Sequence, residues 1–193
     1  MRCPASESEL PGLTWLAYGS SITNSDARGY PHQAARLLGV DVMNMGLSGA
    51  CHMEPEMIDY LCDLDFDFAT CELGVNMRGN FDRNEFERRA SYLFDTFERR
   101  HGGKPLGIIT PFPNFDHFSP KESVTQKRQN EFSEILRDLV KASGNPGIFL
   151  IEGEEVLSRF TGLRIDLLHP SEFGQIHMGI ELAKILAPRI ESL

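Results

Sequence analysis

The chain has 193 residues, which is enough for one α/β domain with a substantial core and short for two. Hydrophobic residues make up 41% and charged residues 24%, a balance typical of a soluble globular protein. With 19 Lys and Arg against 28 Asp and Glu, the formal net charge is −9. Such a charge makes nucleic acid and anionic lipid surfaces poor partners and favours a neutral or cationic small molecule as ligand.

The sequence shows neither a membrane span nor an export signal. No apolar run approaches roughly 18 residues, and residues 1–12 hold no apolar signal-like segment. Cys3, Cys51, Cys62 and Cys71 form no C-x-x-C pair and lack metal-ligand spacing. We therefore expect free thiols in a reducing cytoplasm, no metal, and a single domain over residues 1–193. The oligomeric state stays open.

Short apolar runs that end at or near Gly or Pro predict buried strands. In chain order these are residues 13–18, 40–45, 66–73, 106–110 and 148–151. Strands that alternate with helices favour right-handed crossovers and a parallel sheet covered on both faces. In such sheets the ligand crevice lies beyond the carboxyl ends of the strands.

Helical spacing of apolar residues predicts helices between these strands, over residues 31–38, 83–100, 122–142 and 171–190. Among the residues expected on their apolar faces are Leu37 in the first helix, and Ile176 and Ile180 in the last. His177 in the last helix is expected at the surface.

A serine pair follows the first predicted strand, in Gly19-Ser20-Ser21. Glycine lets the backbone turn sharply, so a serine here is exposed at the rim of the crevice and can act as a nucleophile. The same segment is also an ordinary strand-to-helix loop, in which Ser20 or Ser21 caps a helix.

An acid and a base stand close together before the last predicted helix. Asp166 precedes His169 by three residues, and Pro170 stiffens the turn. The carboxylate can bond one ring nitrogen and leave the other free, which is what the general base of a serine nucleophile needs. A turn Asp beside a solvated His is the alternative.

Glycines and an asparagine follow the second and third predicted strands. Gly46 and Gly49 allow backbone N–H groups to point into the crevice, and Asn76 after Gly74 adds a side-chain donor. Acyl transfer needs such donors around the developing oxyanion. Gly and Asn are equally the residues expected in plain turns.

In this order, the segments 19–21, 44–49, 74–76 and 166–169 resemble the blocks of the SGNH hydrolases, also called the GDSL lipase/esterase superfamily. Ser20 stands where that family usually has Asp, as in a GSS-type subgroup, and Met77 replaces the Asp that often follows the family's Asn. The second departure implies that the loop around Asn76 is held differently.

The resemblance implies a three-layer α/β/α sandwich with a five-stranded parallel sheet, the flavodoxin-like SGNH hydrolase fold. It also implies acyl transfer by Ser21 as nucleophile, His169 as base and Asp166 as the acid that orients it. The N–H groups of Ser21 and Gly49 and the Asn76 side chain match the oxyanion hole. No cofactor is required, and the expected partner is a small-molecule ester.

Three functions remain open at this point: a serine esterase for short-chain esters, an acyltransferase with the same triad, and a non-catalytic binding module. The natural substrate is also open among acetylated sugars, lipids, thioesters and other esters. Cys51 and His52 are adjacent, which indicates that they pack in a loop rather than form a reactive Cys/His pair. Glu54 follows on the same loop. The aromatic segment 112–118 forms either a pocket wall or a flap packed on the core.

Overall fold

The computed structural model describes residues 12–191 and 193. One sheet runs through the molecule, and its five strands are all parallel, in the order β2-β1-β3-β4-β5. The strands are β1 (Thr14–Gly19), β2 (Asp41–Gly46), β3 (Phe68–Glu72), β4 (Leu106–Ile109) and β5 (Ile148–Ile151). The predicted α/β fold with a five-stranded parallel sheet is confirmed.

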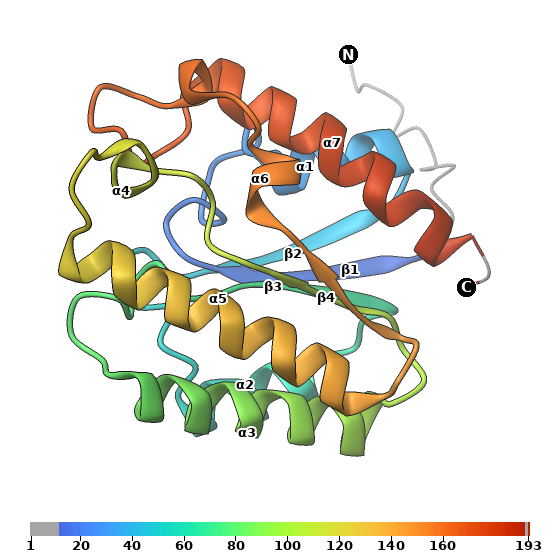
Figure 1. The fold of residues 1–193 in the computed structure, drawn as a ribbon. Helices are drawn as coiled ribbons and strands as arrows, with labels where there is room; N and C mark the ends of the chain where they lie inside the picture. The colour runs from blue at the N-terminus through green and yellow to red at the C-terminus, as the bar shows by residue number, and fades with distance from the viewer. Residues whose placement is uncertain (1–11, 192) are drawn as a thin grey trace, which may run out of the picture.

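Helices cover both faces of this sheet, as Figure 1 shows. They are α1 (Tyr30–Leu38), α2 (Pro55–Asp63), α3 (Arg83–His101), α4 (Phe115–Phe118), α5 (Val124–Ser143), α6 (Gly153–Val156) and α7 (Glu172–Ile190), with a 3-10 turn η1 (Phe160–Gly162). α1 and α7 pack together on one face, and α2, α3 and α5 lie on the other (Figure 1).

The two helical layers enclose two hydrophobic cores, one on each face of the sheet. Trp15 and Ala17 of β1 belong to the core under α1 and α7, whereas Leu16 and Tyr18 belong to the core under α2, α3 and α5. Successive side chains of a strand point to opposite faces, so a strand buried on both faces is apolar along its length. This explains why the segment is a continuous apolar run rather than an alternating one.

The apolar helix faces are only partly as predicted. Leu37, Ile176 and Ile180 were expected in the core, but they are 61%, 41% and 39% exposed. Met178 and Leu182 of α7 are buried instead. Apolar periodicity identifies the helix. Where the apolar face is wider than the surface the helix buries against its neighbours, only the packing decides which apolar residues are covered.

The cysteines, the helix α2 and the hydropathy of the helices bear on further expectations from the sequence. Cys51, Cys62 and Cys71 are free and buried, while Cys3 lies outside the described residues. The helix α2 was not predicted, although Ile58, Leu61 and Cys62 stand at helical spacing and are buried on one face of it. No helix among residues 12–191 and 193 is long and apolar enough to cross a bilayer.

The carboxyl ends of β1, β2 and β3 meet at one edge of the sheet. Gly19, the last residue of β1, is in register with Gly46, the last residue of β2. The N–H of Leu47 donates to the carbonyl oxygen of Gly19 at 2.7 Å, which holds the two following loops together. The polar segments singled out in the sequence therefore converge on this edge.

Candidate active site

The two serines after β1 have different surroundings. Ser20 is fully buried, and its hydroxyl accepts from the N–H of Ile22 at 3.1 Å, within a local turn. Ser21 is half-buried, and its Oγ lies 2.8 Å from His169 Nε2. The turn thus commits the first hydroxyl to the backbone and presents the second to the histidine.

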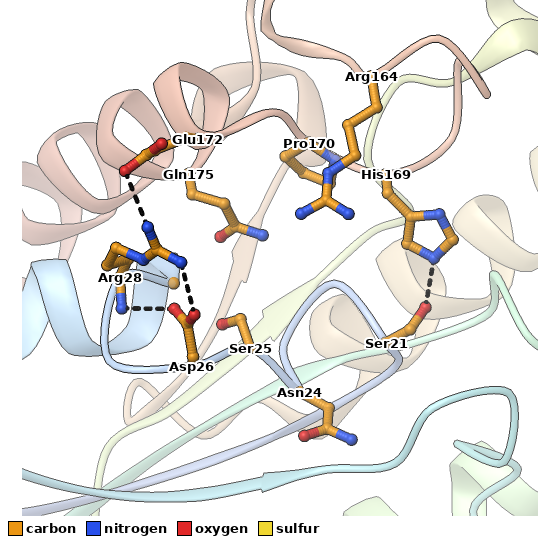
Figure 2. A pocket seen from close by; sticks show the side chains of 11 residues that line it. Ser21, Asn24, Ser25, Asp26, Arg28, Arg164, His169, Pro170, Glu172 and Gln175 are labelled. Atoms are coloured by element: carbon orange, nitrogen blue, oxygen red, sulfur yellow. Dashed lines mark hydrogen bonds and ion pairs between the residues drawn. The ribbon is translucent and has the colours of Figure 1, made fainter.

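Ser21, His169 and Asp166 form one chain of hydrogen-bonding groups. His169 Nδ1 lies 2.9 Å from Asp166 Oδ2, and Nε2 on the other side of the ring faces Ser21. If Nδ1 carries the proton and donates a hydrogen bond to Asp166, Nε2 is left as an acceptor for the Ser21 hydroxyl. Figure 2 shows the imidazole above Ser21, with the dashed line joining Nε2 to Oγ.

The turn that carries Asp166 and His169 is closed by backbone hydrogen bonds. The N–H of Arg164 donates to the His169 carbonyl at 2.8 Å, and the N–H of Leu167 donates to the Arg164 carbonyl at 2.9 Å. Leu167 has a φ of 53°, a left-handed conformation that an L-residue adopts at a cost of roughly 1–2 kcal/mol. The surrounding bonds offset this strain and fix the spacing between acid and base.

Asp166 remains ionised over the whole neutral range. Limited burial raises the pKa of this carboxyl, but the N–H groups of Leu168 and His169 and the His169 ring outweigh it and lower the pKa to about 2. Both N–H groups donate to Oδ1, at 3.0 and 2.9 Å, which leaves Oδ2 for the imidazole. The carboxylate is therefore oriented as well as charged.

Glu72 lies beneath the serine turn and was missed at the level of sequence. This side chain at the end of β3 is fully buried, and its Oε2 accepts from the N–H of Ser20 at 2.7 Å and the hydroxyl of Thr23 at 3.2 Å. Burial raises the pKa of Glu72, and the bonds from Ser20 and Thr23 oppose that rise. Its signal in the sequence is a lone acid in an otherwise uncharged strand.

Close packing around Glu72 also explains the glycine before the serines. A Cβ on Gly19 would lie 2.1 Å from Thr23 Oγ1 and 2.8 Å from Glu72 Oε2, far inside van der Waals contact. Only glycine leaves room for the carboxylate to reach the backbone of the turn. Glu72 and Gly19 thus hold the turn that presents Ser21.

The predicted oxyanion donors lie on the loops after β2 and β3. Gly49 has a φ of 73°, in the left-handed region that glycine enters freely. Asn76 Oδ1 accepts from the N–H of Cys51 at 3.1 Å, and its amide nitrogen has no hydrogen-bond partner among the described residues. The loop after β2 is tied in turn to the serine turn, because Asn24 Nδ2 donates to Ser48 Oγ at 3.0 Å.

A buried arginine holds the loop after Asn76. In this loop Met77 stands at the position where the resemblance implies an aspartate. Met77 is fully buried in the core, and Arg78 is only 6% exposed. The Arg78 guanidinium donates to Asn114 Oδ1 at 2.9 Å and to Gln129 Oε1 at 2.6 Å, and it pairs with Asp116 at 3.1 Å. The loop is thus anchored from the far side by a buried ion pair.

The loop after β2 shows no Cys/His pair of the reactive kind. Cys51 is buried, and its Sγ lies 3.5 Å from the Glu72 carbonyl oxygen. Burial, and after it the nearby Glu72 carboxyl, raises the pKa of the Cys51 thiol, which disfavours the nucleophilic thiolate. His52 faces Glu54 instead, with Nδ1 and Oε1 3.4 Å apart.

The aromatic segment after β4 packs in two ways. Phe112 is buried in the core with its ring edge-on to Tyr30, whereas Phe115 and Phe118 are 41% and 50% exposed. The segment touches the His169 turn, because the N–H of Phe115 donates to the Leu167 carbonyl at 2.7 Å. None of the three rings lines the cavity beside Ser21.

A polar cavity of about 330 Å³ opens beside Ser21 and His169. Its wall is formed mainly by polar and charged side chains from the serine turn, the start of α7 and the His169 turn (Figure 2). Besides the serine and the histidine these include Asn24, Ser25, Asp26, Arg28, Arg164 and Gln175. Residues 12–191 and 193 contain no group of three or more His, Cys, Asp or Glu placed to hold a metal ion.

Comparison with known families and structures gives a consistent picture. A family model described as GDSL-like lipase/acylhydrolase matches residues 14–187. No curated protein matches the chain. A protein of Bacteroides ovatus ATCC 8483 named as a GDSL-like lipase has a similar structure, with a TM-score of 0.79 and 23% identity over 93% of this chain and 54% of that one.

Two further solved structures share the fold. The salicylyl-acyltransferase SsfX3 from a tetracycline biosynthetic pathway has a TM-score of 0.75 and 17% identity over 92% of this chain and 55% of that one. Est24, a carbohydrate acetylesterase from Sinorhizobium meliloti, has a TM-score of 0.69 and 16% identity over 91% and 99%. The chain therefore spans about half of the Bacteroides protein and of SsfX3, and nearly all of Est24.

The buried pair of Arg78 and Asp116 predicts a large effect on stability. Asp116→Asn leaves the Arg78 charge buried without its counterion, so the free energy of unfolding should fall by roughly 3–5 kcal/mol. Urea denaturation followed by circular dichroism measures this change.

Asp63→Asn is the matched control, because Asp63 pairs with Arg100 at the surface with its own side chain 74% exposed. That change should cost less than about 1 kcal/mol. Equal losses in the two variants would show that the Arg78 pair does not anchor the loop.

Proposed function

This chain belongs to the GDSL-like lipase/acylhydrolase family, and we propose that it is a serine esterase hydrolysing short-chain carboxylic esters. The observation that carries the proposal is the 2.8 Å contact between Ser21 Oγ and His169 Nε2, which joins residues 148 positions apart. A nucleophile within hydrogen-bond reach of a base that is itself oriented by an acid is the arrangement that acyl transfer requires.

The reaction proceeds in two acyl-transfer steps. Ser21 Oγ attacks the ester carbonyl carbon while its proton passes to His169 Nε2. The tetrahedral intermediate then collapses, the bond to the alcohol oxygen breaks, and His169 returns the proton to that oxygen. A water molecule next gives a proton to His169 and attacks the acyl-Ser21 carbonyl, and collapse releases the acid and restores the serine.

Asp166 serves this cycle by stabilising the imidazolium. Its pKa of about 2 means that the carboxylate stays charged when His169 takes up the Ser21 proton. The Asp166 carboxylate and the His169 imidazolium together carry no net charge in the transition state. Their attraction lowers the energy of that state. Asp166 also keeps the ring from rotating away from Ser21.

The oxyanion is held by the N–H groups of Ser21 and Gly49 and by the amide of Asn76. Support for Asn76 comes from its hydrogen bond with Cys51, which occupies Oδ1 and leaves the amide nitrogen as a donor. Donors fixed before the reaction cost no reorganisation when negative charge develops on the carbonyl oxygen.

A small ester with a short acyl group suits the cavity beside the triad. The cavity measures about 330 Å³, and its lining side chains are polar or charged apart from Pro170. A long acyl chain gains about 0.8 kcal/mol per CH₂ only where apolar surface covers it, and this wall offers little. Est24, which acts as a carbohydrate acetylesterase, supports an acetyl ester of a polar alcohol as one substrate type.

Acyl transfer to an alcohol is the second candidate, because SsfX3 shares the fold and is an acyltransferase. The polar cavity could hold an acceptor alcohol in place of water. Product analysis with a candidate acceptor present separates the two activities: hydrolysis gives the free acid, and transfer gives a new ester.

The triad predicts specific losses on mutation. Ser21→Ala and His169→Ala should each lower turnover by on the order of 10⁴-fold or more, and Asp166→Ala should retain about 100-fold more activity than either. The Ser21→Ala/His169→Ala double variant should be no worse than the single variants, because the residues act as one unit. Steady-state kinetics on p-nitrophenyl acetate measures these rates.

Labelling with a fluorophosphonate identifies the nucleophile. Mass spectrometry should place the adduct on Ser21, with no labelling of Ser21→Ala and normal labelling of Ser20→Ala if that variant folds. An adduct on Ser20, or no adduct on the folded wild-type protein, would contradict the proposal; the latter result favours a binding module.

Removing the amide donor should slow the chemical step. Asn76→Ala should lower kcat by about 10²–10³-fold and leave KM nearly unchanged, because an oxyanion donor acts mainly on the transition state. Asn76→Asp is the matched variant: it keeps the acceptor for Cys51 but loses the donor, so it should be impaired as well. If Asn76→Asp turns over normally, Asn76 acts only through the loop.

The polar lining of the cavity predicts which acyl-chain lengths the protein prefers. Across p-nitrophenyl esters from acetyl to dodecanoyl, kcat/KM should be highest between acetyl and butyryl and fall at longer chains, since little apolar surface covers the tail. Ser21→Ala gives the background rate for each ester. A maximum of kcat/KM at long chains would contradict the short-chain assignment while leaving the esterase mechanism intact.

A further inference from the structure

Arg164 points into the cavity that holds the proposed nucleophile. Its side chain descends from the His169 turn, and Figure 2 shows the guanidinium between His169 and Gln175, above the serine turn. Because the N–H of Arg164 donates to the carbonyl oxygen of His169 at 2.8 Å, the two residues share one fixed piece of backbone. The backbone of Arg164 therefore keeps its place relative to the base, while the side chain itself is exposed.

The second arginine of the cavity has its charge satisfied. Arg28 pairs with Asp26 at 3.1 Å and with Glu172 at 3.4 Å, as the dashed lines in Figure 2 show. For the Arg164 guanidinium, by contrast, the structure shows no ion pair or hydrogen bond with any of residues 12–191 and 193. This contrast occurs in a chain with a formal net charge of −9, where carboxylates are plentiful.

An unpaired cation beside the base has a cost during acyl transfer. His169 becomes an imidazolium as it takes the Ser21 proton, and a neighbouring positive charge opposes that step. A negative charge on the substrate, bound by Arg164, removes the opposition and turns the cation into a binding group. A planar guanidinium offers paired donors that match a carboxylate.

We infer that Arg164 binds a carboxylate on the substrate, so that the preferred esters are acylated hydroxy acids or acidic sugars. This inference rests on the proposed esterase function. The carboxylate belongs to the alcohol half of the ester, because Arg164 shares the turn of His169, the residue that returns the proton to the leaving oxygen. Asp26 and Glu172 in the same wall disfavour a doubly charged phosphate.

A matched pair of esters tests the charge preference. 3-Acetoxybenzoate and 3-acetoxybenzamide have the same acetyl group and similar leaving groups, but only the first carries a negative charge at pH 7.5. Wild-type protein should show a kcat/KM ratio of about tenfold in favour of the carboxylate, as expected of a charge-assisted hydrogen bond. In Arg164→Gln the ratio should fall to near one, mainly through KM, and Arg164→Lys should keep part of it.

Arg159→Gln is the control for a general charge effect. It removes the same charge from a residue five positions earlier, which is exposed like Arg164 but does not line this cavity. The wild-type ratio should persist in this variant. Equal loss in Arg159→Gln and Arg164→Gln would overturn the inference, as would a wild-type ratio near one.

Two further measurements separate this inference from the esterase proposal. Calorimetric titration of the product 3-hydroxybenzoate reports carboxylate binding without turnover, and binding should weaken about tenfold in Arg164→Gln. Hydrolysis of both esters at equal rates rejects the role of Arg164 and leaves the esterase standing. Absence of hydrolysis together with Arg164-dependent binding rejects the esterase and retains the carboxylate site.

Discussion

Parallel pairing of β1 with β2 on one side and β3 on the other is the constraint on which the active-site edge depends. Each of the three strands ends at the same edge of the sheet and continues into a loop there, so the serine turn, Gly49 and Asn76 lie near one another. The apolar core on both faces fixes the strands, and the strand ends then fix where the loops begin.

Polar groups buried beneath that edge turn proximity into a defined geometry. Glu72 reaches from the end of β3 to the N–H of Ser20 and the hydroxyl of Thr23, and Gly19 gives it room. Arg78 secures the neighbouring loop through Asp116 on the far side. Burial of both side chains is costly unless their polar atoms find partners: Glu72 accepts two hydrogen bonds, and Arg78 has a counterion in Asp116.

Charge is distributed unevenly around the proposed triad. Asp166 is held ionised by backbone donors and supports His169, while Arg28 is neutralised by its two carboxylate neighbours. Arg164 shares the turn of the base without such a partner in the described chain. The proposed carboxylate site therefore depends on this local cation, because the net charge of −9 by itself disfavours an anionic ligand.

The strands of the sheet, the positions of its loops and the segments that hold Ser21, Asn76 and the Asp166–His169 turn can all be predicted from the amino-acid sequence. Buried parallel strands are continuous apolar runs, and an acid and a histidine three apart can bond within one turn, so both signals are local. The sequence does not predict that Ile176 is exposed, that Glu72 supports the serine turn or that Arg78 pairs with Asp116. These features depend on contacts between distant segments, and local periodicity carries no information about which stripe or which partner the packed chain brings together.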